Sequence, residues 1–406
     1  MSSHLITDQG QLPLSVQEVG VATHKIHSCC GVVDASYTEI NTIRTGVNAA
    51  VEWNLTCIAA VFALGILSQA LVLGAIPLAG WMIAPSKEMA TYPFAILLFG
   101  SVIGGFLAPR ITGILGVSGI GLSSACAGVS GALLLGLSIL DRNFNMLCCA
   151  ALLLGFTNAA TFSLRHVAAH YASKDNRMNA LGGFIGVGAL AGFFGGPLAS
   201  AAERWFDPYM LVGTSVVIGV ISLASVILSF YLPQEQVLQS SANINEPIVS
   251  NIEQVNDIPI KATLLSAFSW FTMTAMMAYA PIGMKHCGIS IGSSTTMVAW
   301  HVVAMYAPAA FAAPLLKRIS PYYIAAAGAI IVLFAAMIIL NANSIISFSL
   351  ALIGLGIGWS LNMVATQAWI FKNRAPSVQA LSRYEMLLFT AAMCGAIVSG
   401  QLFVNA

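Results

Sequence analysis

The sequence has 406 residues, of which 58% are hydrophobic and only 8% are charged. A water-soluble domain carries about 25% charged residues, so this chain has too few polar side chains to cover a surface in water. We therefore predict an all-α polytopic membrane protein. The net charge of +1, with no basic run, gives no indication of nucleic-acid binding.

Residues 1–54 contain too few consecutive apolar side chains to cross a membrane. From Ile40 to Val51 apolar residues recur every three or four positions, which is typical of an amphipathic helix. We expect a cytoplasmic N-terminal tail that ends in a lead-in helix lying at the membrane interface. A charged segment followed by a short apolar core is not found there, so we expect no cleaved signal peptide.

About 20 apolar residues are needed for one helix to cross the hydrocarbon core. By that measure the sequence predicts eleven spans, at residues 55–79, 90–110, 115–139, 146–166, 179–201, 208–231, 262–284, 294–316, 321–340, 345–370 and 378–404. The polar segment 232–261 is predicted to be a cytoplasmic loop that joins a six-helix bundle (55–231) to a C-terminal bundle (262–406). An equal second bundle would need a twelfth span, and the sequence leaves open whether the C-terminus is truncated.

Short segments recur at a nearly constant offset in the two predicted bundles. Residues 104–109 (GGFLAP) match residues 309–314 (AAFAAP), and residues 179–181 (NAL) match residues 379–381 (QAL). Gly195 and Gly395 are also in register. These repeats predict two pseudo-symmetric bundles, an architecture in which secondary transporters bind their substrate between the halves.

Lys and Arg residues alternate with the predicted spans. If the N-terminus is cytoplasmic, twelve of them fall in inner segments and four fall in outer loops, namely Lys87, Arg142, Arg204 and Lys285. Because positive side chains concentrate in cytoplasmic loops, we expect the N-terminus and the central loop to be cytoplasmic.

Residues 105–112 follow the second predicted span and read GFLAPRIT. They resemble the G-x-L-A-D-R-x-G motif of the major facilitator superfamily, with Pro109 in place of the acidic residue and Thr112 in place of the last glycine. Residues 300–308 read WHVVAMYAP and are similar to the W-H-V-x-x-M-F/Y-A-P segment of one bacterial branch of that superfamily, whose members are mostly uncharacterised permeases. The resemblance implies the superfamily fold and transport across a bacterial cytoplasmic membrane, and it leaves the substrate open.

The fifth span is similar to the antiporter motif of the superfamily, with Gly183, Gly192, Gly196 and Pro197 at the motif's spacing. Small residues every four positions let helices approach closely, and proline bends or ends a helix. Two interpretations of these glycines stay open. One is ordinary tight packing between the bundles, and the other is a stiff interface between the bundles that favours exchange over symport.

Glu385 is the acidic residue that lies well inside a predicted span, where an ionisable group is costly and points to function. We expect it to couple transport to protons or to form, with Arg165, a gate that breaks on protonation. The alternative is a purely structural ion pair between Glu385 and Arg165. His301 is a second candidate proton carrier, and its alternative is a neutral, hydrogen-bonded histidine. His166 and His170 are expected to face lipid headgroups.

In the superfamily, the first, fourth, seventh and tenth spans line the cavity. By that resemblance the candidate substrate-binding residues are Gln69, Asn158, Trp270, Thr274, Asn362 and Gln367. Their alternative role is hydrogen bonding between helices, because buried amides need partners.

These features predict a secondary active transporter that moves a small solute by alternating access and is coupled to protons. The antiporter-like glycines favour export, whereas Ala151 stands where proton-driven drug exporters carry an arginine. Uptake of a vitamin, a metal chelate or a metabolite stays open, as does a decayed permease that transports nothing. No nucleotide-binding loop, metal-ligand spacing or catalytic constellation is found, so we expect no cofactor and no enzymatic activity. We also expect the protein to be a monomer.

Overall fold

The computed structural model describes residues 32–171, 185–209, 211–232, 258–372 and 376–404. Gly183 and most of the predicted central loop lie outside these residues. Met1–Ala50 and Val51–Ala406 form two separate compact units, and the contacts described below all lie within the second unit.

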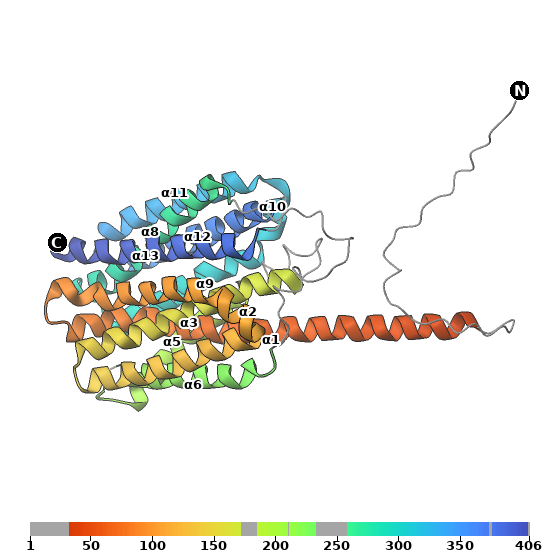
Figure 1. Cartoon of the computed structure of the whole chain (residues 1–406). Coiled ribbons are helices and arrows are strands. Elements are labelled where there is room, and N and C mark those ends of the chain that lie inside the picture. The colour runs from red at the N-terminus through yellow and green to blue at the C-terminus, as the bar shows by residue number, and fades with distance from the viewer. Residues whose placement is uncertain (1–31, 172–184, 210, 233–257, 373–375, 405–406) are drawn as a thin grey trace, which may run out of the picture. The chain divides into compact units, whose positions relative to one another are not determined.

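The described part of the chain is helical and contains no β-strand. Its helices are α1 (Val32–Ile83), α2 (Tyr92–Leu140), α3 (Phe144–Tyr171), α5 (Gly188–Trp205), α6 (Val212–Ser229), α8 (Ile260–His286), α9 (Ile291–Ala310), α10 (Ala312–Arg318), α11 (Pro321–Leu340), α12 (Ile345–Ile370) and α13 (Val378–Val404), with a short 3-10 helix η1 (Lys87–Thr91) (Figure 1).

Each of the eleven predicted spans overlaps a helix, and residues 179–184 of the fifth span lie outside the described part of the chain. Spans two and three are the two limbs of α2, which departs from helical geometry at Gly116, where φ is 72°. Glycine adopts a positive φ without strain, so the chain reverses there. The predicted lead-in helix is continuous with the first span, because α1 runs through residue 54 without a break.

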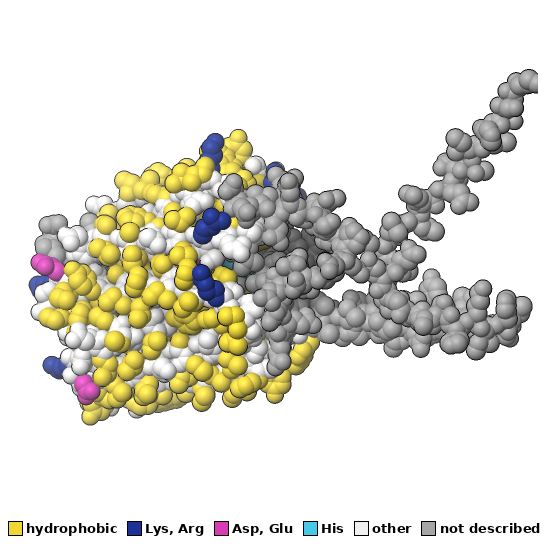
Figure 2. Space-filling view, viewed as in Figure 1, with side chains coloured by type: hydrophobic (Ala, Val, Ile, Leu, Met, Phe, Trp, Pro, Cys, Tyr) yellow, Lys and Arg dark blue, Asp and Glu magenta, His cyan; other side chains and the backbone are white. Residues whose placement is uncertain are grey.

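Seven helical stretches of the described chain are long and apolar enough to cross a membrane, and one of them, Lys87–Leu140, contains two of the predicted spans. The remaining three predicted spans coincide with α5, α8 and the α9–α10 pair. Figure 2 shows a broad hydrophobic surface over the bundle, with charged side chains toward its two ends. This distribution suits a protein whose middle is surrounded by lipid.

Two seams join the helices of the first half (α1–α6) to those of the second half (α8–α13). In one seam α2 packs on α13, and in the other α5 packs on α9. The glycines of α5 make the second seam tight: a β-carbon at Gly196 would lie 2.8 Å from the Ala299 Cβ, and one at Gly192 would lie 2.6 Å from the Val303 nitrogen. Pro197 does not end the helix, because α5 continues to Trp205.

Within the first half, Gly155 lies where α3 crosses α2. A β-carbon at Gly155 would lie 2.7 Å from the carbonyl carbon of Leu97 and 3.1 Å from the Gly100 Cα. Both atoms belong to the backbone of α2, so they move only if the whole helix moves.

We therefore expect Gly155→Ala to lower the free energy of unfolding by about 1–3 kcal/mol, the usual result of overpacking. Thermal unfolding of the purified protein in detergent measures this change. Gly219→Ala is the matched control, because its β-carbon would lie an ordinary 3.6 Å from Ala132. Equal unfolding midpoints for the two variants would contradict this account of the helix crossing.

Candidate functional site

A buried ionic cluster joins the two halves. The Arg165 guanidinium, on α3, pairs with the Glu385 carboxylate, on α13, and their side chains are 1% and 8% exposed. His166 Nε2 lies 3.0 Å from the same Glu385 oxygen. These are the salt bridges found in the described part of the chain. The structure thus contains the Arg165–Glu385 pair that the sequence analysis offered as an alternative.

The expected position of His166 was wrong. It does not face headgroups, because its side chain is only 13% exposed and contacts Glu385. His166 follows Arg165 directly on α3, and both side chains lie where α3 meets α13 and α12. The side chain of His170 lies outside the described residues.

The guanidinium of Arg165 has two further contacts. Its Nη1 lies 3.5 Å from the Met363 sulfur on α12, and its Cζ lies 5.2 Å from the centre of the Phe162 ring. The Nε atom has no hydrogen-bond partner among the described residues. Since a buried charge is tolerated only when it is paired, the stability of Arg165 here depends on the Glu385 carboxylate.

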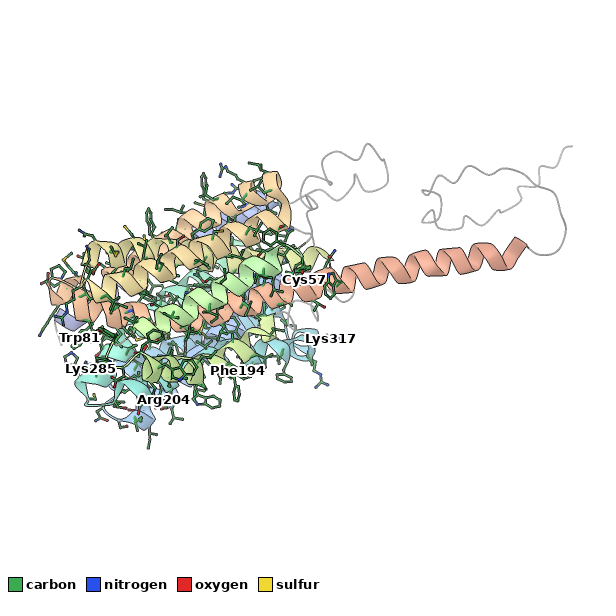
Figure 3. All side chains as sticks on the ribbon, turned by 90° about the horizontal axis from the view of Figure 1, so that it is seen from below. Cys57, Trp81, Phe194, Arg204, Lys285 and Lys317 are labelled. Atoms are coloured by element: carbon green, nitrogen blue, oxygen red, sulfur yellow. The ribbon has the colours of Figure 1, made fainter. Side chains whose placement is uncertain are left out.

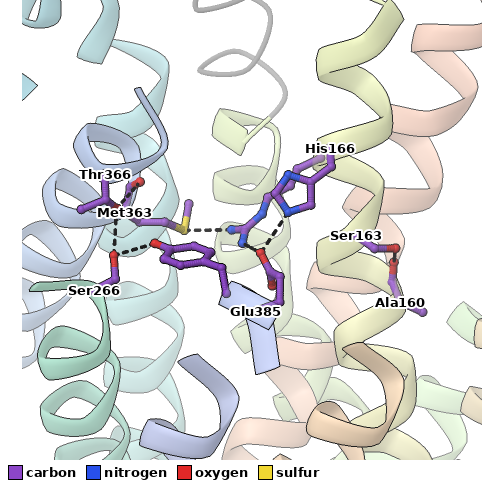
Figure 4. Close-up of polar contacts among 9 residues, drawn as sticks. Ala160, Ser163, His166, Ser266, Met363, Thr366 and Glu385 are labelled. Carbon is purple, nitrogen blue, oxygen red and sulfur yellow. Dashed lines mark hydrogen bonds and ion pairs between the residues drawn. The ribbon is translucent and has the colours of Figure 1, made fainter. Parts of the chain in front are cut away.

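A series of hydrogen-bonded hydroxyl groups begins at Tyr384, the residue before Glu385 (Figure 4). The Tyr384 hydroxyl lies 2.7 Å from Ser266 Oγ, which donates to Thr366 Oγ1 at 3.0 Å. Thr366 Oγ1 in turn donates to the Asn362 carbonyl at 2.8 Å. These bonds link α13 to α8 and α12, so they fix the turn of α13 that carries Glu385. Sequence reasoning missed them, although Tyr384 is the immediate neighbour of Glu385.

An aromatic cluster lies next to the ionic cluster. Trp270 on α8 is at its centre, with its ring 5.7 Å from Phe162, 5.2 Å from Trp359 and 5.6 Å from Phe389. Tyr306 on α9 extends it, 6.0 Å from Trp359. All five side chains are buried. Phe162 precedes Arg165 by one helical turn and Phe389 follows Glu385 by one turn, so the aromatic cluster is deeper in the bundle.

The aromatic cluster contains an unused hydrogen-bond donor. Trp359 is 0% exposed, and its Nε1 atom has no partner among the described residues. A buried indole N–H normally donates a hydrogen bond to an acceptor. The described part of the chain supplies no acceptor for Trp359, so its N–H is available to a bound solute.

The predicted substrate-binding residues are all buried. Trp270 lies in the aromatic cluster. Asn158 donates to Ser101 Oγ on α2 at 3.0 Å, and Asn362 donates to the Ala325 carbonyl on α11 at 3.0 Å. These two amides thus make hydrogen bonds between helices, which is the alternative role expected for the predicted substrate-binding residues. The Oε1 atom of Gln367 has no partner among the described residues, and Thr274 and Gln69 are 3% and 8% exposed.

His301 is not part of the ionic cluster. It is fully buried on α9, and its Nδ1 lies 2.6 Å from the Leu352 carbonyl on α12. Donation from Nδ1–H to that carbonyl fits a neutral imidazole that ties α9 to α12. This geometry favours the structural interpretation of His301.

The halves also touch at the opposite end of the bundle. There the Lys285 ammonium, at the end of α8, lies 3.9 Å from the centre of the Trp81 ring, at the end of α1 (Figure 3). A cation–π contact at an exposed site is worth about 0.5–1 kcal/mol, whereas breaking a buried ion pair costs about 3–5 kcal/mol. Trp81 is 40% exposed, so of these two charged contacts the Trp81–Lys285 contact is the weaker.

Comparison with known proteins gives relatives that are transporters. The chain is 24% identical over 354 residues to the riboflavin transporter RfnT of Brucella anthropi, a match that covers 86% of this chain and 88% of that protein. It is 23% identical to the uncharacterized MFS-type transporter YddS of Bacillus subtilis, covering 79% of this chain and 78% of that protein.

Solved structures of transporters share the fold. The xylose transporter XylE of E. coli, in a partially occluded inward-open conformation, matches with a TM-score of 0.65 at 13% identity, covering 88% of this chain and 96% of that one. The E. coli fucose:proton symporter FucP matches with a TM-score of 0.57 at 13% identity, covering 86% and 96%. The family model of the Major Facilitator Superfamily matches residues 53–399, and the chain belongs to this superfamily of multi-pass membrane transporters.

Proposed function

We propose that this protein is a proton-coupled secondary transporter of a flat heteroaromatic solute, placed in a bacterial cytoplasmic membrane with its N-terminus inside. The observation that carries the proposal is the ionic cluster of Arg165, His166 and Glu385, which joins the two halves one helical turn from the aromatic cluster. Alternating access requires a contact of this kind, one that holds the halves together at one end and can be released.

Protonation of Glu385 supplies the release. A proton that binds the carboxylate makes it neutral and removes its attraction for Arg165, so α3 and α13 can separate and water can reach the guanidinium. When the proton leaves on the other side of the cycle, the carboxylate is charged again and the pair re-forms. His166 is placed to pass the proton, because its Nε2 lies 3.0 Å from the Glu385 oxygen.

The aromatic cluster supports the solute class. Aromatic rings offer flat faces on which a heteroaromatic ring can stack, and the Trp359 N–H offers a donor for an acceptor on the ring edge. Phe162 belongs to the first half, whereas Trp270, Trp359 and Phe389 belong to the second. A ring bound among them would therefore contact both halves. The riboflavin transporter among the relatives makes riboflavin a suitable probe.

We expect Glu385→Gln to abolish accumulation of riboflavin driven by a pH gradient in proteoliposomes, while exchange of labelled for unlabelled riboflavin continues. The amide keeps the size of the side chain but cannot gain and lose the proton. Wild-type protein in a pH jump gives the direction, since riboflavin that moves with protons indicates uptake and riboflavin that moves against them indicates export. Gradient-driven accumulation by the variant would show that Glu385 is not the coupling group.

The double variant Arg165→Gln with Glu385→Gln separates coupling from stability. Glu385→Gln alone leaves a buried guanidinium unpaired, which costs about 3–5 kcal/mol, and removing both charges relieves that cost. We expect the double variant to regain thermal stability without regaining gradient-driven accumulation. Recovery of both properties would indicate a purely structural pair.

We expect Trp359→Phe to weaken riboflavin binding about two- to tenfold, because the ring face is kept and a buried hydrogen bond worth about 0.5–1.5 kcal/mol is lost. Trp270→Leu, which removes the central ring, should weaken binding further. Fluorescence titration of the purified protein measures both effects.

Phe194→Leu is the matched control for these two variants. Its ring also pairs edge-to-face with an aromatic neighbour, at 5.3 Å from Phe193, but it is 53% exposed on α5. Equal loss of affinity in the Phe194 and Trp270 variants would remove the aromatic cluster as the solute site.

A further inference from the structure

We infer that a cavity at the end of the bundle opposite the ionic cluster is a second solute site, which receives the apolar ring of an uncharged or zwitterionic solute before it reaches the aromatic cluster. The inference rests on the proposed function, because it concerns the same solute. The cavity has a volume of about 400 Å³ and is named here the end cavity; its walls include Gly74, Leu78, Gly195, Asp207, Thr214 and Val298.

The end cavity has the dimensions and chemistry of a small-molecule site. Pockets of about 300–1,000 Å³ with mostly apolar walls and a few polar groups are typical of ligand sites. Here the walls are apolar and small along α1, α5 and α9, and the charged groups gather where α5 ends. Because α1 and α5 belong to the first half and α9 to the second, a solute bound there contacts both halves.

The charged groups at the mouth of the end cavity favour a solute without net negative charge. The Glu203 carboxylate accepts hydrogen bonds from the Leu211 N–H at 2.7 Å and from the Thr214 hydroxyl at 2.6 Å, so it caps the start of α6. Arg204 and Asp207 are both exposed and form no ion pair within the described residues. The lining of the cavity thus contains one cationic side chain, Arg204, and two carboxylates, Glu203 and Asp207. A phosphorylated solute, with a charge of about −1.5 to −2, would be repelled by this net negative charge.

The approach to the end cavity is aqueous. On its lateral side the seam is closed, since a β-carbon at Gly196 would lie 2.8 Å from Ala299. The large side chains on the two helices of this seam, Phe194 on α5 and Trp300 on α9, are 53% and 52% exposed. Arg204 lies at the same end of the bundle as the Trp81–Lys285 contact (Figure 3). This arrangement favours a solute from water over a lipid from the bilayer.

Gly74 permits a clean test. A β-carbon at Gly74 would have no atom within 4 Å, so Gly74→Phe can fill the end cavity without displacing a helix. Gly113 on α2 likewise has nothing within 4 Å of its β-carbon but does not line the cavity, so Gly113→Phe is the matched control.

Equilibrium dialysis of the purified proteins against riboflavin at saturation gives the number of bound molecules. We expect two per wild-type chain and per Gly113→Phe chain, one per Gly74→Phe chain, and one per Trp270→Leu chain. Riboflavin 5′-phosphate should compete at least tenfold less well for the molecule that Gly74→Phe loses. Asp207→Asn should reduce that discrimination.

The outcomes separate this inference from the proposed function. If wild-type protein binds one riboflavin, and Trp270→Leu abolishes this binding while Gly74→Phe leaves it unchanged, the end cavity is not a solute site and the aromatic cluster is. If wild-type protein binds one riboflavin and only Gly74→Phe abolishes it, the end cavity is supported and the aromatic cluster is overturned as the solute site. A phospholipid retained by wild-type protein and lost from Gly74→Phe, detected by native mass spectrometry, would also overturn the inference. Absence of riboflavin binding in wild-type protein would overturn both proposals.

Discussion

The buried pair of Arg165 and Glu385 is the interaction on which the arrangement of the two halves depends. Neither charge is stable alone in an apolar interior, so α3 is held to α13 as long as both are charged. The hydroxyl chain from Tyr384 through Ser266 to Thr366 fixes Glu385 within the second half. A change of charge on this carboxylate therefore acts on the contact between α3 and α13, because the turn that carries Glu385 is held in place by these bonds.

The repeats found in the sequence correspond to equivalent contacts in the two halves. The segments 104–109 and 309–314 lie in α2 and in α9–α10, each of which forms one side of a seam. Gly195 of α5 faces Ala70 of α1, and Gly395 of α13 faces Phe271 of α8. The fifth span thus packs on the first as the eleventh packs on the seventh, which is the pseudo-symmetry expected of an internal repeat.

The spans could be predicted from the sequence because the length of an apolar run depends on neighbouring residues alone. Glu385 could be identified for a similar reason, since an acidic residue inside such a run is costly wherever the helix lies. The rest of the site depends on how helices are rotated against one another. His166 was misplaced, and Phe162, Trp359 and Phe389 were not identified, because no local pattern tells which faces of α3, α12 and α13 meet.

The two ends of the bundle contain different kinds of charged contact between the halves. At one end the Trp81–Lys285 contact is partly exposed and worth about 0.5–1 kcal/mol. At the other end the Arg165–Glu385 pair is buried, and removing one partner of such a pair costs about 3–5 kcal/mol. Under the proposed function, a proton on Glu385 acts on the second contact and leaves the first unchanged, because Lys285 keeps its charge. A charge-dependent contact at one end only is what the proposed coupling requires, since the two ends then respond differently to the same proton.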